Sequence, residues 1–336
     1  MNDKLIIPKN YDSKLSIKET ELAIKMIKDL FEQNLADSLN LKRVSAPLFV
    51  RPSSGLNDDL NGVERPVAFD ILDIKAEVQI IHSLAKWKRM ALGKYGFKPG
   101  EGLYTDMNAI RRDETLDNLH SVYVDQWDWE KIITAGERSF DTLKLIVKRI
   151  VSAINLTAAE LYSSFPIVKT EFPEDIFFIS TQELEDRYPD KTPFERENEI
   201  AREHGLVFIS QIGKYLESGK RHDGRAPDYD DWELNGDIIY WSPVLGRCFE
   251  ISSMGIRVDE KSLDYQLKKL NCDYRRDYAF HKMLLNGELP LTIGGGIGQS
   301  RLCMLMLGKA HIGEVQVSVW PDDMIEHCAA HNIHLL

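Results

Sequence analysis

The chain has 336 residues, of which 43% are apolar and 28% are charged, as is usual for a globular protein with a sizeable core. Its formal net charge of −11 argues against nucleic acid as a partner, because a phosphate backbone would be repelled overall, although a local cluster of arginines can still bind a small anion. No apolar run approaches the roughly 20 residues of a membrane span, and the first residues lack the apolar core of a signal peptide.

The cysteines and the overall composition predict one domain in a reducing compartment. The four cysteines are far apart and form no C-x-x-C pair, so we expect free thiols, no zinc site and a cytoplasmic location. No repeat or long flexible linker divides the sequence. We therefore predict a single domain over residues 1–336.

The first part of the chain predicts two helices and a strand. Residues 16–39 form a helix that begins with a capping box, Ser16 with Glu19, and continues with apolar residues at helical spacing. Residues 41–50 are predicted to form a strand that contains Pro47, which places it at a sheet edge or a subunit interface. Residues 82–96 predict the second helix.

The rest of the chain alternates between hairpin-like strands and separate helices. Residues 102–132 predict a strand, a polar loop and a second strand, and residues 140–165 a long helix. Further elements are predicted in chain order: strands near 206–211, 237–242 and 246–253, helices in 263–270 and 275–287, and a strand, glycine bend and helix in 291–307. Without regular strand–helix alternation, this order favours an antiparallel α+β fold over a doubly wound one.

A glycine cluster, LTIGGGIGQSR at 291–301, suggests a phosphate site but fits neither common pattern. No lysine follows Gly298, as a P-loop would require, and Arg301 stands where a dinucleotide fingerprint has its third glycine. One interpretation is a strand against which a flat ligand lies, with Arg301 meeting an anion. The other is tight packing under a helix, with Arg301 in an ordinary salt bridge.

The predicted hairpin at 102–132 carries a second candidate site. Arg111 lies where the first strand ends, and arginine suits phosphate geometry better than lysine. On the second strand, Gln126 and Asp128 share one face and could hold a ligand's ammonium group. An ordinary amphipathic edge strand is the alternative explanation of that pair.

Two further stretches are unusually polar. Arginines and aspartates crowd into residues 221–237, where they could recognise a zwitterion or hold Mg²⁺ beside a triphosphate; a solvated loop is the alternative. The stretch RCFEISSMGIRVDE at 247–260, which resembles a strand, carries Glu250, Ser253 and Arg257; it is more polar than a buried strand should be, which favours a pocket lining. Motifs of covalent catalysis are missing from the sequence, so positioning and electrostatic stabilisation must perform any chemistry.

These parts together resemble the catalytic core of class II aminoacyl-tRNA synthetases. The strings IHSLAKWKR, HSVYVDQWDWE, RAPDYDDW, SSMGIRVD and TIGGGIGQSRL are similar, more narrowly, to the ammonia-dependent asparagine synthetase family over about residues 14–320. The resemblance implies an antiparallel sheet flanked by helices. It also implies that ATP adenylates the side chain of L-aspartate, and that ammonia then displaces AMP to give L-asparagine, with Mg²⁺ accompanying ATP. A homodimer formed through the first helix and the Pro47 strand is implied as well.

The resemblance also assigns roles to individual residues. It implies catalytic roles for Asp58, Arg111 and Gln126, with Asp58 near the acyl carbon, where it would orient ammonia or take its proton; the adjacent Asp59 could fill this place instead. The aspartate pocket would comprise Ser83, Lys88, Gln126, Asp128, Arg225, Asp230, Ser253 and Arg257. The nucleotide would contact Arg111, Ser121, Asp237, Glu250, Gly296 and Arg301, and Asp237 and Glu250 would hold Mg²⁺.

Two other functions compete with this one. An aspartyl- or asparaginyl-tRNA synthetase needs an anticodon-binding module of roughly 100 residues, for which the chain has no room. A non-catalytic relative that binds an amino acid or nucleotide as a regulator would have no need of Arg111, Gln126, Asp128 and Arg301 together. Free ammonia is the expected nitrogen donor, because the sequence offers no glutaminase-like cysteine triad.

Overall fold

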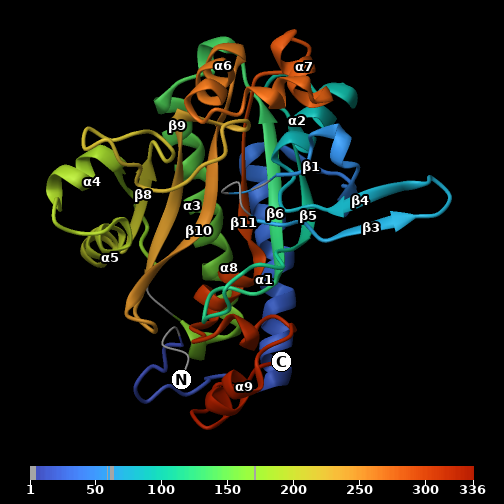
Figure 1. Cartoon of the computed structure of the whole chain (residues 1–336). Helices are drawn as coiled ribbons and strands as arrows, with labels where there is room; N and C mark the ends of the chain where they lie inside the picture. The colour runs from blue at the N-terminus through green and yellow to red at the C-terminus, as the bar shows by residue number, and fades with distance from the viewer. Residues whose placement is uncertain (1–4, 59, 61–63, 170–171) are drawn as a thin grey trace.

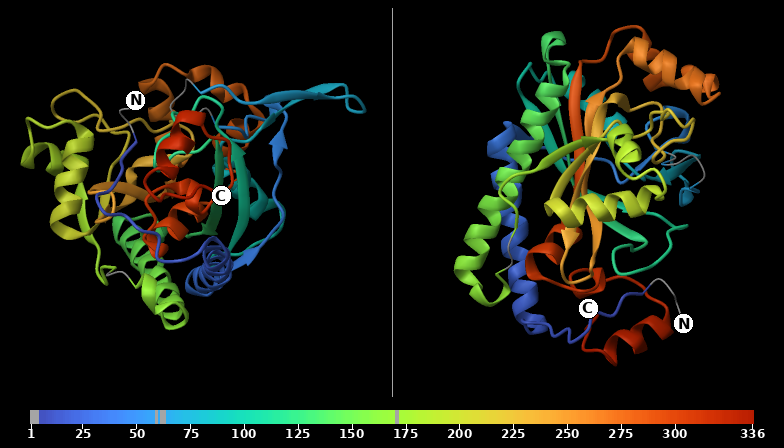
Figure 2. Two further views of the ribbon diagram at one scale, coloured as in Figure 1. Left: turned by 90° about the horizontal axis from the view of Figure 1, so that it is seen from below. Right: turned by 90° about the vertical axis from the view of Figure 1, so that its left-hand side faces the viewer.

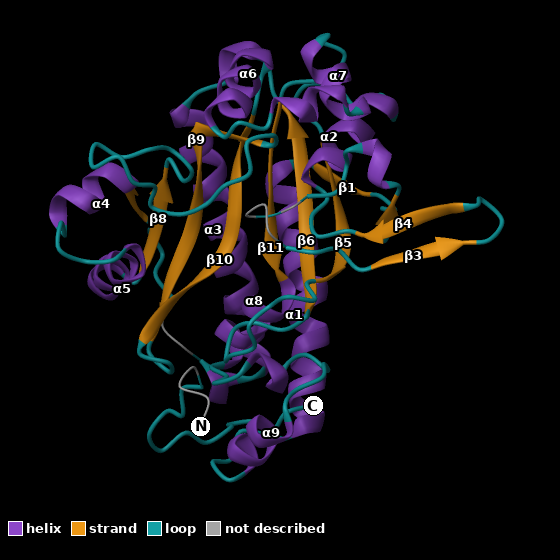
Figure 3. Cartoon of the chain, in the orientation of Figure 1, coloured by secondary structure: helices purple, strands orange, loops and turns teal. Residues whose placement is uncertain are grey.

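The structure, a computed structural model, describes residues 5–58, 60, 64–169 and 172–336. Its centre is an eight-stranded sheet with helices on one face and at both ends (Figure 1, Figure 3). The strands are, in spatial order, β1 (Leu41–Arg43), β5 (Gly102–Ile110), β6 (Tyr123–Ile132), β11 (Thr292–Gly298), β10 (Arg247–Arg257), β9 (Asp230–Ser242), β8 (Leu206–Ser210) and β7 (Phe177–Ser180).

The sheet is mixed, so the prediction of an antiparallel sheet is correct only for its centre. Strands β5, β6, β11, β10, β9 and β8 pair antiparallel, whereas β1 pairs parallel with β5 and β7 pairs parallel with β8. Parallel neighbours need a long crossover connection. Helices α4 (Thr181–Arg187) and α5 (Pro193–His204) supply one between β7 and β8.

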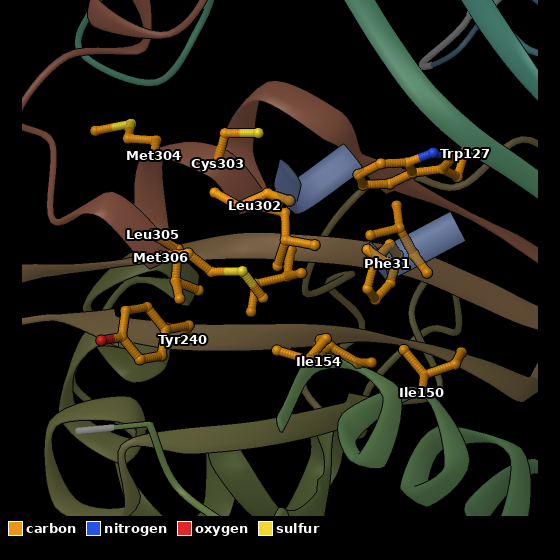
Figure 4. Close-up of a cluster of buried hydrophobic side chains, with 14 of the residues drawn as sticks. Phe31, Trp127, Ile150, Ile154, Tyr240, Leu302, Cys303, Met304, Leu305 and Met306 are labelled. Atoms are coloured by element: carbon orange, nitrogen blue, oxygen red, sulfur yellow. The ribbon is translucent and has the colours of Figure 1, made fainter. Parts of the chain in front are cut away.

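Two long helices cover one face of the sheet and bury most of the core. Helices α1 (Ile17–Leu39) and α3 (Phe140–Ser164) lie side by side along this face (Figure 2). The predicted capping box is confirmed, because Ser16 and Glu19 exchange hydrogen bonds at the start of α1. Phe31 of α1 packs on Trp127 of β6 with ring centroids 4.7 Å apart (Figure 4).

Shorter helices close the ends of the sheet. Helices α2 (Ala85–Lys94), α6 (Glu260–Lys269) and α7 (Ala279–Leu285) gather at the top of Figure 1. At the opposite end, α8 (Gln299–Leu307) continues directly from β11, and α9 (Asp322–Ala329) lies near the C-terminus. Across the described residues, no helix combines the length and apolarity needed to cross a bilayer.

A second, three-stranded sheet projects from the body on the side of β1 and β5 (Figure 1). It contains β2 (Phe49–Val50), β4 (Ala76–Ile80) and β3 (Ala68–Ile71), in that order. The prediction of one strand over 41–50 is therefore wrong. The segment divides into β1 and β2, which belong to different sheets, and Pro47 lies between them because proline cannot donate a ladder hydrogen bond.

Candidate active site

The site lies on the face of the sheet opposite α1 and α3, and β6 explains why. Successive side chains of a strand point to opposite faces. Trp127 and Trp129 are therefore buried in the apolar core, while Gln126 and Asp128 line a cavity of about 390 Å³. The prediction that Gln126 and Asp128 share one face of a strand is confirmed.

The glycines of β11 lie between the two strands that carry most of the site. Gly294, Gly296 and Gly298 are paired with Glu130, Asp128 and Gln126 on β6. A Cβ atom on Gly294 would lie 1.9 Å from Glu130 Oε2, and one on Gly296 would lie 2.6 Å from Gln126 Oε1. At Gly294 the protein's own side chains fill the space, so a flat ligand does not lie against the strand there.

Three charged residues form an ion-pair network at the Gly294 end of the cavity, in which an arginine lies between two acids. Arg257 of β10 donates from Nε and Nη2 to Glu130 at 3.0 and 2.7 Å, and from Nη1 to Asp230. All three side chains are buried. Glu130 does not itself line the cavity; it lies beneath Arg257, which does. Arg257 is thus held in one orientation, ready to meet a ligand's carboxylate.

Lys88 of α2 reaches the same end of the cavity from the other side. Its ammonium group donates to Asp128 and, at 3.0 Å, to the carbonyl of Gly295. Burial lowers the pKa of Lys88, although the carboxylates of Asp128 and Glu130 oppose this effect. For Glu130 the balance is reversed: burial raises its pKa, but Arg257 and Lys88 outweigh burial and hold it below the ordinary value.

A second set of polar groups lies at the middle of the cavity, where β9 and β10 are neighbours. Arg225 donates to Asp237 at 2.6 Å and to the hydroxyl of Ser253, which is paired with Asp237 across the two strands. Burial and the nearby carboxylate of Glu250 raise the pKa of Asp237 to about 7, against the lowering effect of Arg225.

The Gly298 end of the cavity holds the residues predicted to bind the nucleotide. Arg301, in the first turn of α8, donates from Nη1 to the carbonyl of Glu250 at 3.0 Å, and its distance to the carboxylate of Glu250 is 3.9 Å. Arg111 follows directly after β5, and its buried Nε atom has no hydrogen-bond partner. Ser121 donates to Ser318 at 2.8 Å. The free guanidinium donor of Arg111 points to an anionic ligand.

Asp58 lines the cavity from the segment that joins β2 to β3 of the small sheet. It is 2% exposed, and the amide oxygen of Asn57 accepts hydrogen bonds from the backbone of both Asp58 and His82 at 2.9 Å. His82 Nδ1 in turn lies 3.0 Å from the carbonyl oxygen of Asp58. Asp59, the alternative candidate, lies outside the described residues.

The structure brings every residue that the sequence analysis assigned to the site into contact with this one cavity. These lining residues are Asp58, Ser83, Lys88, Arg111, Ser121, Gln126, Asp128, Arg225, Asp230, Asp237, Glu250, Ser253, Arg257, Gly296 and Arg301. Their individual roles remain predictions.

Sequence reasoning missed Glu130 and Tyr229. Glu130 continues the alternation of Gln126 and Asp128 by one more step, so the period of the strand could have identified it. Tyr229 lines the cavity and places its ring 5.9 Å from the guanidinium of Arg257. Burial and the nearby Asp58 raise the pKa of Tyr229 above its usual range.

The charged stretch at 221–237 is not a solvated loop. Asp228 is 1% exposed and is surrounded by Arg275 at 2.9 Å, His281 at 2.9 Å and Lys86 at 3.3 Å. These contacts fix the backbone between Arg225 and Asp230, both of which line the cavity. The charged residues of this stretch therefore line the cavity or fix the backbone that carries its lining residues.

Among the described residues, no group of three or more histidine, cysteine or acidic side chains is arranged to hold a metal ion. Asp237 and Glu250 provide two neighbouring carboxylates, whose mutual repulsion contributes to the raised pKa of Asp237. Magnesium is commonly bound by one or two carboxylates together with substrate phosphates. The pair therefore fits an ion that arrives with a nucleotide.

Comparison with solved structures supports a class II synthetase fold. The asparaginyl-tRNA synthetase of Pyrococcus horikoshii, complexed with asparaginyl-adenylate, superposes with a TM-score of 0.67 at 15% identity, over 90% of this chain and 70% of that one. A putative aspartyl-tRNA synthetase from Leishmania major gives 0.60 at 16% identity, over 89% and 64%. At such low identity these likenesses show the fold alone.

Sequence comparison identifies the family. The family model described as aspartate-ammonia ligase matches residues 18–332. The aspartate–ammonia ligase of Ruminiclostridium cellulolyticum is 63% identical over 99% of this chain and 100% of its own length. That of Clostridium tetani is 60% identical over 100% of this chain and 98% of its own. The chain therefore belongs to the aspartate–ammonia ligase family.

Proposed function

We propose that this protein is an ATP-dependent ligase that joins ammonia to L-aspartate and produces L-asparagine, AMP and pyrophosphate through a β-aspartyl-adenylate. Family membership over nearly the whole chain supports the overall reaction. The observation that supports the route is that Lys88 and Arg257 line one end of the same cavity that Arg111 and Arg301 line at the other.

In the first step, the cavity would hold aspartate by its α-carboxylate and α-ammonium groups. Arg257 and Lys88 would meet the carboxylate, while Gln126 and Asp128 would accept hydrogen bonds from the ammonium group. The β-carboxylate would then extend towards the Gly298 end, where it attacks the α-phosphorus of ATP. Holding both reactants in line supplies much of the rate acceleration, since no covalent enzyme intermediate is needed.

The arginines at the Gly298 end would stabilise the charge that develops during this attack. Arg111 would donate to the α-phosphate oxygens from its free Nε atom, and Arg301 would fix the nucleotide. Asp237 and Glu250 would hold the Mg²⁺ that accompanies ATP, and this ion would neutralise the phosphates and the departing pyrophosphate. Asp237 would then exchange part of its contact with Arg225 for the ion.

In the second step, ammonia would attack the acyl carbon, and AMP would leave with the bridging oxygen and the electron pair of the broken C–O bond. Asp58 would orient ammonia or accept the proton that it loses. Cys248, Cys272, Cys303 and Cys328 are all buried and do not line the cavity, which supports free ammonia, rather than ammonia released from glutamine by a thiol, as the donor.

We further propose that the chain is a single catalytic domain that works as a cytoplasmic homodimer. Apolar side chains are exposed on α1 and on the projecting sheet; they include Ile17, Leu22, Leu48, Phe49, Phe69 and Leu72. Exposed apolar side chains on these two elements support an interface that includes them, because apolar surface is often buried by a partner subunit. Light scattering at micromolar concentration should give twice the mass of one chain, and a monomer would contradict the proposal.

One assay tests the reaction. The protein is incubated with aspartate, ATP, Mg²⁺ and ammonium, and the products are measured over time. AMP, pyrophosphate and asparagine should form in equal amounts. A parallel incubation replaces ammonium with tRNA. AMP formed only in the presence of tRNA would favour an aminoacyl-tRNA synthetase, and the absence of AMP in both would favour a non-catalytic binding protein.

A further inference from the structure

Helix α8 begins without a cap of its own. Its N-cap residue is Gly298, which has no side chain to satisfy the first backbone N–H groups. The carboxylate of Asp125, on β6, takes this role instead: Oδ1 accepts from the backbone N–H of Ser300 at 3.1 Å, and Oδ2 accepts from the Ser300 hydroxyl at 2.8 Å. An acid at this end of a helix is also favoured by the helix dipole.

Asp125 is itself fixed by two further donors. Gln316 donates from Nε2 to Oδ1 at 3.2 Å, and Lys28 of α1 donates from Nζ to Oδ2, also at 3.2 Å. The side chain of Asp125 is 7% exposed, so the contacts form away from bulk water. Each carboxylate oxygen thus has two donors, and the group joins α1, β6 and α8 at one point.

Arg301, which follows Ser300 directly, depends on where this helix begins. It is in the first turn of α8 and reaches across to the carbonyl of Glu250 on β10. Asp125 leaves β6 on the opposite face from its neighbour Gln126, but near the Gly298 end it still belongs to the lining of the cavity. A contact that fixes the first turn of α8 therefore fixes the direction in which Arg301 enters the cavity.

We propose that Asp125 is a positioning residue for nucleotide binding, which acts through Ser300 to hold Arg301 against the Gly298 end of the cavity. This inference rests on the proposed function, because it assumes that Arg301 binds ATP. It predicts a larger effect on the nucleotide half of the site than on the aspartate half. The aspartate-half residues Gln126 and Asp128 share β6 with Asp125, but the side chain of Asp125 bonds to Ser300, Gln316 and Lys28 and to neither of them.

The test measures steady-state constants for Asp125→Ala, Arg301→Ala and the double variant. Asp125→Ala should raise the KM for ATP about fivefold to twentyfold, while the KM for aspartate changes less than about twofold. In the Arg301→Ala background, the same substitution should have almost no further effect, because the two residues act as one unit. Additive effects, or equal increases in both KM values, would overturn the inference.

Lys28 supplies a milder variant and a matched control. Lys28→Met removes one donor to Asp125 and should raise the KM for ATP about twofold to threefold. Lys25→Met, about one turn earlier on α1, breaks an exposed ion pair with Asp29 and should leave the KM for ATP unchanged. If Asp125→Ala does not fold, Asp125→Asn takes its place in the double-variant cycle. If the KM for ATP does not change in Arg301→Ala, the result counts against the proposed function. If the KM for ATP rises in Arg301→Ala but stays unchanged in Asp125→Ala, the result counts against this inference alone.

Discussion

The guanidinium group of Arg257 meets the carboxylate of Glu130 directly above Gly294, with Nη2 and Oε2 2.7 Å apart. The two residues come from β10 and β6, which are not neighbours in the sheet, because β11 lies between them. Only a residue without a side chain on β11 allows this contact. The glycine therefore determines which charged groups can meet at this end of the cavity.

Replacing Gly294 by alanine should separate this pair. The new Cβ atom would lie 1.9 Å from Glu130 Oε2 and 2.6 Å from Arg257 Nη2, so both side chains must move. We expect the KM for aspartate to rise at least about tenfold and the free energy of unfolding to fall by about 1–3 kcal/mol. Gly136→Ala is the matched control, because nothing lies within 4 Å of the Cβ position there. Equal behaviour of the two variants would refute this account.

Replacing Glu130 by glutamine should destabilise the protein, because it leaves the buried charge of Arg257 with Asp230 as its anionic partner. Breaking a buried ion pair from one side costs about 3 kcal/mol or more. Chemical denaturation of Glu130→Gln at pH 7.5 should show a loss of this order. Glu21→Gln, at an exposed position of α1, should leave the unfolding curve where it is.

The Glu130→Gln variant should also reveal how the free energy of unfolding depends on pH. The pKa of Glu130 is lower in the folded protein than the value of about 4.3 expected when unfolded, so its stabilising effect is complete above that value. The effect disappears as the pH falls through the lower pKa of the folded state. The difference in unfolding free energy between the original protein and Glu130→Gln should be constant from pH 8 to 5 and shrink towards pH 3. A difference that grows on acidification would have the wrong sign.

Asp237 should make the binding of magnesium–ATP depend on pH. Its pKa is raised to about 7, and only the ionised carboxylate can hold the metal. The KM for magnesium–ATP should therefore rise about tenfold from pH 8 to pH 6, beyond what the titration of ATP itself causes. Asp237→Asn should retain only the dependence that belongs to ATP. Parallel profiles for the two proteins would show that Asp237 does not titrate in this range.

Asp58→Ala should slow the second half-reaction far more than the first. If Asp58 serves the attack of ammonia, the exchange of pyrophosphate into ATP should stay within about threefold, while asparagine formation falls about a hundredfold. Asp59→Ala, at the adjacent position, is the natural comparison. Loss of both half-reactions to the same extent in Asp58→Ala would remove its assignment to the second step.

Elements with strong local signals were predicted well from the sequence. Helix α1 has a capping box at Ser16 and a long apolar face, and α3 has a similar face, so the predicted bounds of both agree with the structure to within a residue. The site residues of β10 were singled out because their polarity conflicts with the burial that their strand requires. Those of β6 also fitted an ordinary edge strand, and the family resemblance assigned them to the site. The helical spacing of apolar residues and the unexpected polarity of a buried strand were both visible in the sequence.

Other elements depend on contacts that no local pattern reports. Strands β1 and β7 have three and four residues, too few to show a period, and their parallel pairing is decided by partners distant in the chain. The start of β9 was missed because Asp230 and Asp231 suggest a solvated loop, whereas ion pairs with Arg257 and Arg138 allow both carboxylates to be buried in a strand. The ion-pair partners are visible only once the fold brings them together.

The alternation along β6 also links the chemistry of this protein to the accuracy of its folding. A shift of β6 by one residue against β5 and β11 would place Trp127 and Trp129 in the cavity, and Gln126 and Asp128 in the apolar core. The burial of two tryptophans thus penalises every form shifted by an odd number of residues far more than the polar residues alone could. In a chain that buries both tryptophans, Gln126 and Asp128 therefore face the cavity, and the core itself selects their orientation.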